Sequence, residues 1–82
     1  MTIRTLKGVT GFELPPAARV HRALAAAGHA YTYTQVNDAM RGRVAMRLQL
    51  ARDICTVLRY SVEQSWMFAT EILARANNHR RS

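Results

Sequence analysis

The chain is 82 residues long, enough for one small domain, and 49% of its residues are hydrophobic, a share that excludes an intrinsically disordered protein. Twelve Lys and Arg residues against five Asp and Glu residues give a net charge of +7, and every cation except Lys7 is an arginine. The single cysteine, Cys55, excludes an internal disulfide.

This charge favours a polyanionic partner. Arginine binds phosphate oxygens and guanine edges through paired N–H donors, so a surplus of guanidinium groups is typical of proteins that bind nucleic acid. Residues 1–8 lack the apolar run of a secretory signal, and no stretch approaches the roughly 18 apolar residues of a membrane-spanning helix. We therefore expect a cytoplasmic protein, associated with the nucleoid of a bacterial cell.

Residues 1–14 are expected to form an arm or lead-in, because Gly8 and Gly11 interrupt any regular pattern. Proline is tolerated in the first turn of a helix, so Pro15-Pro16 predicts a helix start. The helix is predicted to end at Gly28, since glycine readily adopts a left-handed conformation. Between these limits, apolar residues recur at spacings of three and four: Val20, Ala23, Leu24 and Ala27.

The second helix is predicted to begin at Thr32 or Thr34, because Thr32-Tyr33-Thr34-Gln35 has the spacing of a capping box, and to end at Gly42. A third helix is predicted over residues 43–59. Its apolar residues cover about twice the arc of an ordinary surface helix, so we expect it to be central and covered on two sides.

A fourth helix is predicted from Ser61, where Ser61-Val62-Glu63-Gln64 repeats the capping-box spacing, to about Ala76, with Asn77-Asn78 ending it. Its apolar stripe contains Val62, Trp66, Ala69, Leu73 and Ala76, widened by Phe68 and Ile72, while Glu63, Glu71 and Arg75 lie on the other side. The predicted fold is thus a single all-α domain of four to five short helices. It has a core at 15–59, a packing or dimerisation helix at 61–77 and a basic tail at 78–82.

Catalysis finds little support in the sequence. The five acidic residues form no recognisable pair, the three histidines lie far apart, and no glycine-rich phosphate loop is present. Cys55 falls on the apolar arc of the predicted third helix, where a small core residue is expected rather than a nucleophile. We expect no enzyme activity, no cofactor and no metal site.

The order of the predicted helices resembles the three-helix core of small helix-turn-helix DNA-binding regulators of the plasmid or phage repressor type. The similarity covers Leu24-Ala25-Ala26-Ala27-Gly28, Thr32, Val36, Met40 and Gly42. It implies a turn at 41–43 followed by a helix whose N-terminal half enters the major groove. In this frame Arg43 and Arg47 contact base edges, Arg41 and Arg52 lie near phosphates, and a helix N-terminus holds a further phosphate through Thr32, Thr34 and Gln35.

A rival helix-turn-helix frame lies downstream. It uses Ile54-Cys55, Leu58, the turn Arg59-Tyr60-Ser61, and then Trp66 and Phe68. In this frame Ser61, Gln64 and Ser65 face DNA. The clustering of arginines favours the first frame.

Apolar surface beyond what the first two helices can cover predicts a homodimer through the C-terminal helices. The expected interface residues are Leu58, Val62, Trp66, Phe68, Ala69, Ile72 and Leu73. The favoured function is therefore sequence-specific binding of double-stranded DNA by a dimeric repressor. The alternative is a phage-type inhibitor or adaptor that docks its basic face on an acidic protein surface, and RNA binding is the weaker third possibility.

Overall fold

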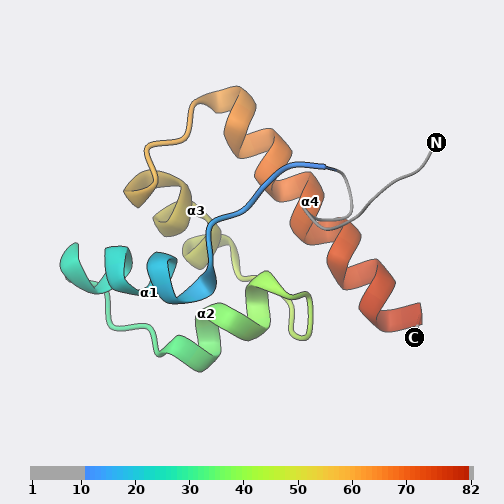
Figure 1. Ribbon diagram of the computed structural model, residues 1–82, viewed down its shortest axis with the longest axis horizontal. Coiled ribbons are helices and arrows are strands. Elements are labelled where there is room, and N and C mark those ends of the chain that lie inside the picture. Colours follow the sequence, from blue (N-terminus) through green and yellow to red (C-terminus); the bar gives the residue numbers. More distant parts are fainter. Residues whose placement is uncertain (1–10, 82) are drawn as a thin grey trace.

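The chain folds into four helices. The structure, a computed structural model, describes residues 11–81, with side chains for 11–78. The helices are α1 (Ala17–Ala26), α2 (Tyr33–Met40), α3 (Leu48–Val57) and α4 (Val62–Arg81). Within the described residues there is no strand, so the prediction of an all-helical fold is confirmed. The three short helices gather on one side, and α4 runs alongside them as a single long rod (Figure 1).

The limits of α1 and the start of α2 follow local signals in the sequence. Pro16 is the N-cap of α1. Gly28 ends the helix with φ +92°, and the backbone bonds Gly28 N to Ala25 O and His29 N to Leu24 O form a Schellman motif. Thr32 caps α2 through the predicted capping box. These boundaries confirm the sequence prediction.

The start of the third helix differs from the prediction. Gly42 has φ +80° and closes a second Schellman motif, in which Arg43 N bonds to Asp38 O. Residues 43–47 then form a non-helical connection, and α3 begins only at Leu48, five residues later than predicted. The helical spacing of apolar residues before Leu48 was misleading, because the chain needs these residues to cross from the end of α2 to the start of α3.

The α3–α4 turn is short. Residues 58–61 connect the two helices, and Arg59, with φ 59°, occupies the left-handed position that Gly28 and Gly42 occupy elsewhere. Its N–H bonds to Thr56 O, and Tyr60 N bonds to Cys55 O. The second predicted capping box is present at the start of α4, between Ser61 and Gln64. Asn77-Asn78 do not end α4, which continues to Arg81, so residues 78–81 are helical rather than a tail.

The core lies where α1 packs against α2 and α3, and α2 against α4. It contains Val20, Leu24, Val36, Ala39, Met40, Leu50, Ile54, Phe68 and Ile72. α3 is not covered on two sides as predicted, because Leu48 is 73% exposed. The predicted apolar stripe of α4 also divides: Phe68 and Ile72 enter the core, whereas Val62, Trp66 and Leu73 are 81%, 71% and 61% exposed.

Candidate nucleic-acid interface

Most arginines are on the surface. Of the arginines whose side chains the structure describes, all except Arg75 are exposed: Arg19, Arg22, Arg41, Arg43, Arg47, Arg52 and Arg59. Within this set, ion pairs to carboxylates are formed by Arg43, to Asp38 at 3.6 Å, and by Arg75, to Glu71. The remaining guanidinium groups form no ion pair within the described side chains, although the charge of Arg52 acts on the neighbouring Asp53.

Three of the four arginines predicted to contact DNA do not lie within a helix. Arg41 is the C-cap of α2, Arg43 follows Gly42, and Arg47 is the N-cap of α3. The three-residue turn of the first helix-turn-helix frame is thus replaced by the seven-residue connection 41–47. Arg52 alone of the four lies within α3, on its exposed side. Direct base contacts by Arg43 and Arg47 from within a helix, as predicted, do not fit this geometry.

The structure nevertheless brings two of these arginines together. Arg41 and Arg43 line an open hollow of about 510 Å³ between the C-terminal end of α2, the N-terminal end of α1 and α4. Arg75 from α4 lines the same space. We call this feature the arginine hollow; its other lining residues are Leu14, Pro15, Pro16, Ala17, Asn37 and Met40. Arg47 and Arg52 are not among its lining residues.

Arg75 is a further functional candidate. The sequence predicted only that it lies on the polar side of the fourth helix. Its Nε donates to Glu71 Oε2 at 2.5 Å, and its Nη1 donates to the Met40 carbonyl at 3.3 Å. Glu71, predicted on the same outer face, is fully buried. The pair therefore holds the last turn of α2 against α4. The spacing of four residues could have indicated the ion pair, but not its burial.

The residues predicted to contact phosphate at the start of α2 include two that cap the helix instead. Thr32 Oγ1 accepts from Gln35 N at 3.1 Å, and Gln35 Oε1 accepts from Thr32 N at 2.8 Å. These side chains stabilise the helix start. Thr34 is exposed beside them. Thr32 and Arg41 flank opposite ends of α2, which is about 12 Å long, so the structure does not join Thr32, Thr34 and Gln35 to the arginines of the hollow.

In the rival frame, the connection between α3 and α4 has the expected length, but the first helical turn of α4 does not suit DNA. Four residues connect α3 to α4, as in helix-turn-helix motifs. Of its predicted DNA-facing residues, Ser61 and Gln64 bond to each other in the capping box, and half-buried Ser65 lines a small hollow with Arg52. The exposed positions Val62, Glu63 and Trp66 are apolar or acidic, which suits a protein contact better than a phosphate backbone.

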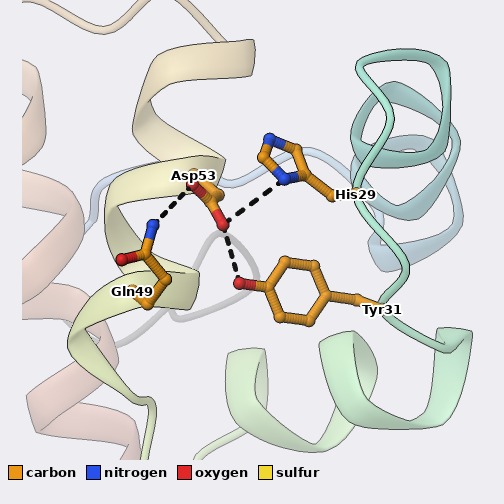
Figure 2. Close-up of polar contacts among 4 residues, drawn as sticks. All are labelled: His29, Tyr31, Gln49 and Asp53. Atoms are coloured by element: carbon orange, nitrogen blue, oxygen red, sulfur yellow. Dashed lines mark hydrogen bonds and ion pairs between the residues drawn. The ribbon is translucent and has the colours of Figure 1, made fainter.

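A hydrogen-bonded cluster around Asp53 was not predicted (Figure 2). Tyr31 Oη donates to Asp53 Oδ2 at 2.7 Å, Gln49 Nε2 donates to Asp53 Oδ1 at 3.0 Å, and His29 Nδ1 lies 3.6 Å from Oδ2. The cluster ties the α1–α2 connection to α3. The Gln49–Asp53 spacing of four was a visible signal, whereas the approach of Tyr31 depends on the tertiary fold.

These contacts shift two pKa values in opposite directions. The hydrogen bond from Tyr31 lowers the pKa of Asp53; the Gln49 hydrogen bond and the charges of His29 and Arg52 act in the same direction, against the opposing effect of burial. The same hydrogen bond raises the pKa of Tyr31. The cluster thus holds Asp53 as a carboxylate whose oxygens accept hydrogen bonds from both elements.

One face of α4 is apolar and uncovered. We call Val62, Trp66, Ala69 and Leu73 the α4 face; all four residues are exposed. An adjoining apolar groove of about 450 Å³ is lined by Leu73 and by residues of the 41–47 connection and α3, among them Val44 and Leu48. Of the other predicted interface residues, Leu58 is half-buried, while Phe68 and Ile72 belong to the core of the single chain and also line the floor of this groove.

Other classes of site are not evident in the described residues. No three His, Cys, Asp or Glu side chains among them are grouped as a metal site requires. Cys55 is half-buried beside the core. The helices described include none with the length and apolar character needed to cross a membrane. Comparison with protein-family models, curated proteins and solved structures finds no significant match to the chain.

Proposed function

We propose that the protein is a small repressor that binds double-stranded DNA as a homodimer. The observation that carries the proposal is the surplus of exposed arginines, most of which form no ion pair to a carboxylate within the described side chains, on a chain of net charge +7. Such a surface attracts phosphate backbones and gains affinity by releasing their counterions. Arginine also pairs with phosphates through two N–H donors, which fixes orientation on the duplex.

The connection 41–47 and the exposed side of α3 are the proposed DNA-contacting elements. Arg41 and Arg43 lie at one end of the connection and Arg47 at the other, directly before the first turn of α3. Arg52 adds a cation one turn into that helix. We assign these arginines mainly to phosphates, because only Arg52 is carried on a helix that could enter a groove.

The α4 face is the proposed dimer interface. Twenty residues make α4 about 30 Å long, and its exposed Val62, Trp66 and Leu73 lie along one side. Two copies packed through this face would each remove large apolar side chains from water. A single chain of this size buries a smaller share of its unfolded surface than a larger domain does, so pairing adds stability that it needs.

Duplex binding is tested by fluorescence anisotropy with a random-sequence pool, followed by selection of bound sequences. We expect binding that weakens steeply with salt and enrichment of a palindrome. The double variant Arg43→Ala/Arg47→Ala should lose more affinity than Arg19→Ala/Arg22→Ala, which removes the same charge from α1. Equal losses would show that binding depends on net charge alone and not on the connection 41–47. Absence of binding at low salt would refute the proposal.

Dimerisation is tested by sedimentation velocity over a range of concentrations. We expect twice the mass of one chain, and a monomer for Leu73→Asp. Met67→Asp is the matched control, since Met67 is also an exposed apolar residue of α4 but lies off the α4 face. A wild-type chain that stays monomeric at high concentration would contradict the interface.

The α4 face also favours a second candidate function. Exposed tryptophan and aliphatic residues are typical of protein interfaces, and the exposed arginines suit an acidic surface, so the alternative function is an inhibitor or adaptor that docks on an acidic host protein. This function predicts a stoichiometric complex with one acidic protein that Trp66→Asp abolishes, together with no shift of a random duplex at low salt.

A further inference from the structure

The arginine hollow joins three sources of positive potential. Arg41 and Arg43 come from the end of α2, Arg75 comes from α4, and the N-terminal turn of α1 supplies the positive end of a helix dipole. None of the residues that line it in the described part of the chain is an Asp or Glu. The hollow is therefore electropositive at its surface, although acidic side chains lie behind two of its arginines.

Arg75 is held in place at the α4 side of the hollow. Its Nε is bonded to the buried Glu71 and its Nη1 to the Met40 carbonyl. A guanidinium group has five N–H donors, so these two bonds use two of them while Arg75 also lines the hollow. The Met40 bond also covers a carbonyl at the negative end of α2. Arg75 is thus oriented before any ligand arrives, which reduces the entropy lost on binding.

Arg41 and Arg43 are anchored more weakly. Arg41 Nε donates to Asn37 Oδ1 at 3.2 Å, and Arg43 Nη1 lies 3.6 Å from Asp38 Oδ1. Both side chains are exposed, so these contacts are worth little in water. A doubly charged oxyanion offers each guanidinium group a stronger, two-pronged acceptor.

The α1 terminus adds backbone donors. The first turn contains no acidic residue, and the N-cap Pro16 makes no side-chain cap bond. The first described backbone bonds of the helix are those from Arg19 N and Val20 N to Pro16 O. The N–H groups of Ala17 and Ala18 therefore have no acceptor among residues 11–81, and Ala17 lines the hollow.

We propose that the arginine hollow is a phosphate-binding site, in which Arg41, Arg43 and Arg75 hold the oxyanion together with the first N–H groups of α1. Glu71 acts as a positioning residue for Arg75. The phosphoryl group comes either from a small phosphorylated molecule or from the backbone of the duplex. The duplex source rests on the proposed function, whereas the small-molecule source does not.

The probe is inorganic phosphate, titrated at constant ionic strength by replacing chloride while amide and Arg Nε resonances are followed by NMR. We expect saturable shifts at Ala17, Ala18, Arg41 and Arg43, and at Arg75 Nε. Arg41→Gln should weaken binding about tenfold. Arg22→Gln, which removes the same charge from an exposed site on α1 outside the hollow, should change it less than twofold.

A neutral variant separates site geometry from charge. Ala17→Pro removes one N–H donor at the first helical position, where proline is well tolerated, and leaves the net charge unchanged. We expect it to weaken phosphate binding at least threefold while the helix content measured by circular dichroism stays the same. Non-saturable shifts in the wild type, or equal effects of Arg41→Gln and Arg22→Gln, would overturn the proposal.

Duplex titrations of the same variants identify the source. If Arg41→Gln weakens duplex binding more than Arg22→Gln, and phosphate competes with the duplex, the ligand is a backbone phosphate. If phosphate binds saturably but neither competes nor shares this sensitivity, the ligand is a small phosphorylated molecule. Absence of duplex binding beside saturable phosphate binding would refute the proposed function and leave the site intact.

Discussion

Replacing Gly42 with alanine should destabilise the protein strongly, because two separate effects act at this position. The residue has φ +80°, a left-handed conformation that costs an L-residue about 1–2 kcal/mol. An added Cβ would also lie 2.6 Å from Ala76 N and from the carbonyl carbon of Arg75. These are backbone atoms of α4 and cannot rotate away, so α2 and α4 must separate.

Overpacking of this kind costs about 1–3 kcal/mol, so the two effects together come to about 2–5 kcal/mol. A domain of this length has a total free energy of unfolding of about 4–12 kcal/mol. Gly42→Ala should therefore leave a protein that unfolds at much lower denaturant concentration, or one that is partly unfolded in buffer.

Gly28→Ala is the matched control, because Gly28 has φ +92° and an added Cβ there would meet only open space. It should lose only the conformational part, about 1–2 kcal/mol. Urea titrations followed by circular dichroism give both free energies of unfolding. A Gly42→Ala protein that is no less stable than Gly28→Ala would show that the close approach to α4 does not exist.

Three further predictions concern the turn after α3, the buried ion pair and the Asp53 cluster. Arg59→Gly should raise the free energy of unfolding by about 1 kcal/mol, because glycine removes the left-handed strain at φ 59°. Arg59→Ala keeps that strain and should not raise it, so equal urea midpoints for the two variants would contradict this prediction. Glu71→Gln should cost about 3 kcal/mol by the same assay, since it leaves the Arg75 charge without its buried partner, and a loss below that of a typical surface change would refute the burial. The lowered pKa of Asp53 means that its contribution is present above the ordinary carboxyl pKa of about 3.9 and is lost as pH falls through the lowered value. Tyr31→Phe should therefore reduce stability at pH about 7 and flatten its decline towards pH about 3, and an unchanged acid limb would contradict the Tyr31–Asp53 bond.

Local signals predicted most of the helix boundaries. Pro16, Gly28 and Gly42 act through their own backbone preferences, and Thr32 and Ser61 act through side chains three residues from their partners. Such signals need no knowledge of the rest of the fold. Arg59 shows their limit: it is left-handed because the chain must turn there to let α4 leave, and nothing in an arginine side chain indicates that conformation.

Long-range contacts explain what the sequence could not reveal. Residues 43–47 have helical spacing, yet the docking of Gly42 on α4 commits the chain to a non-helical path, and this removed Arg43 and Arg47 from the predicted reading helix. The helical pattern placed Glu71 on the polar side of the fourth helix, but in the structure it is buried and paired with Arg75. The arginine hollow depends on the same docking, since its arginines belong to segments over thirty residues apart in the chain.

The way α4 is attached has a consequence for how the molecule fluctuates. Only Phe68, Glu71 and Ile72 of its twenty residues are buried in the described side chains, and they occupy little more than one turn. Amide protons before and after that turn should exchange with solvent through small local openings, while those of the central turn require α4 to detach as a unit. Any molecule that covers the outer side of α4 would slow this detachment, so recognition of a partner and rigidity of the helix are thermodynamically linked.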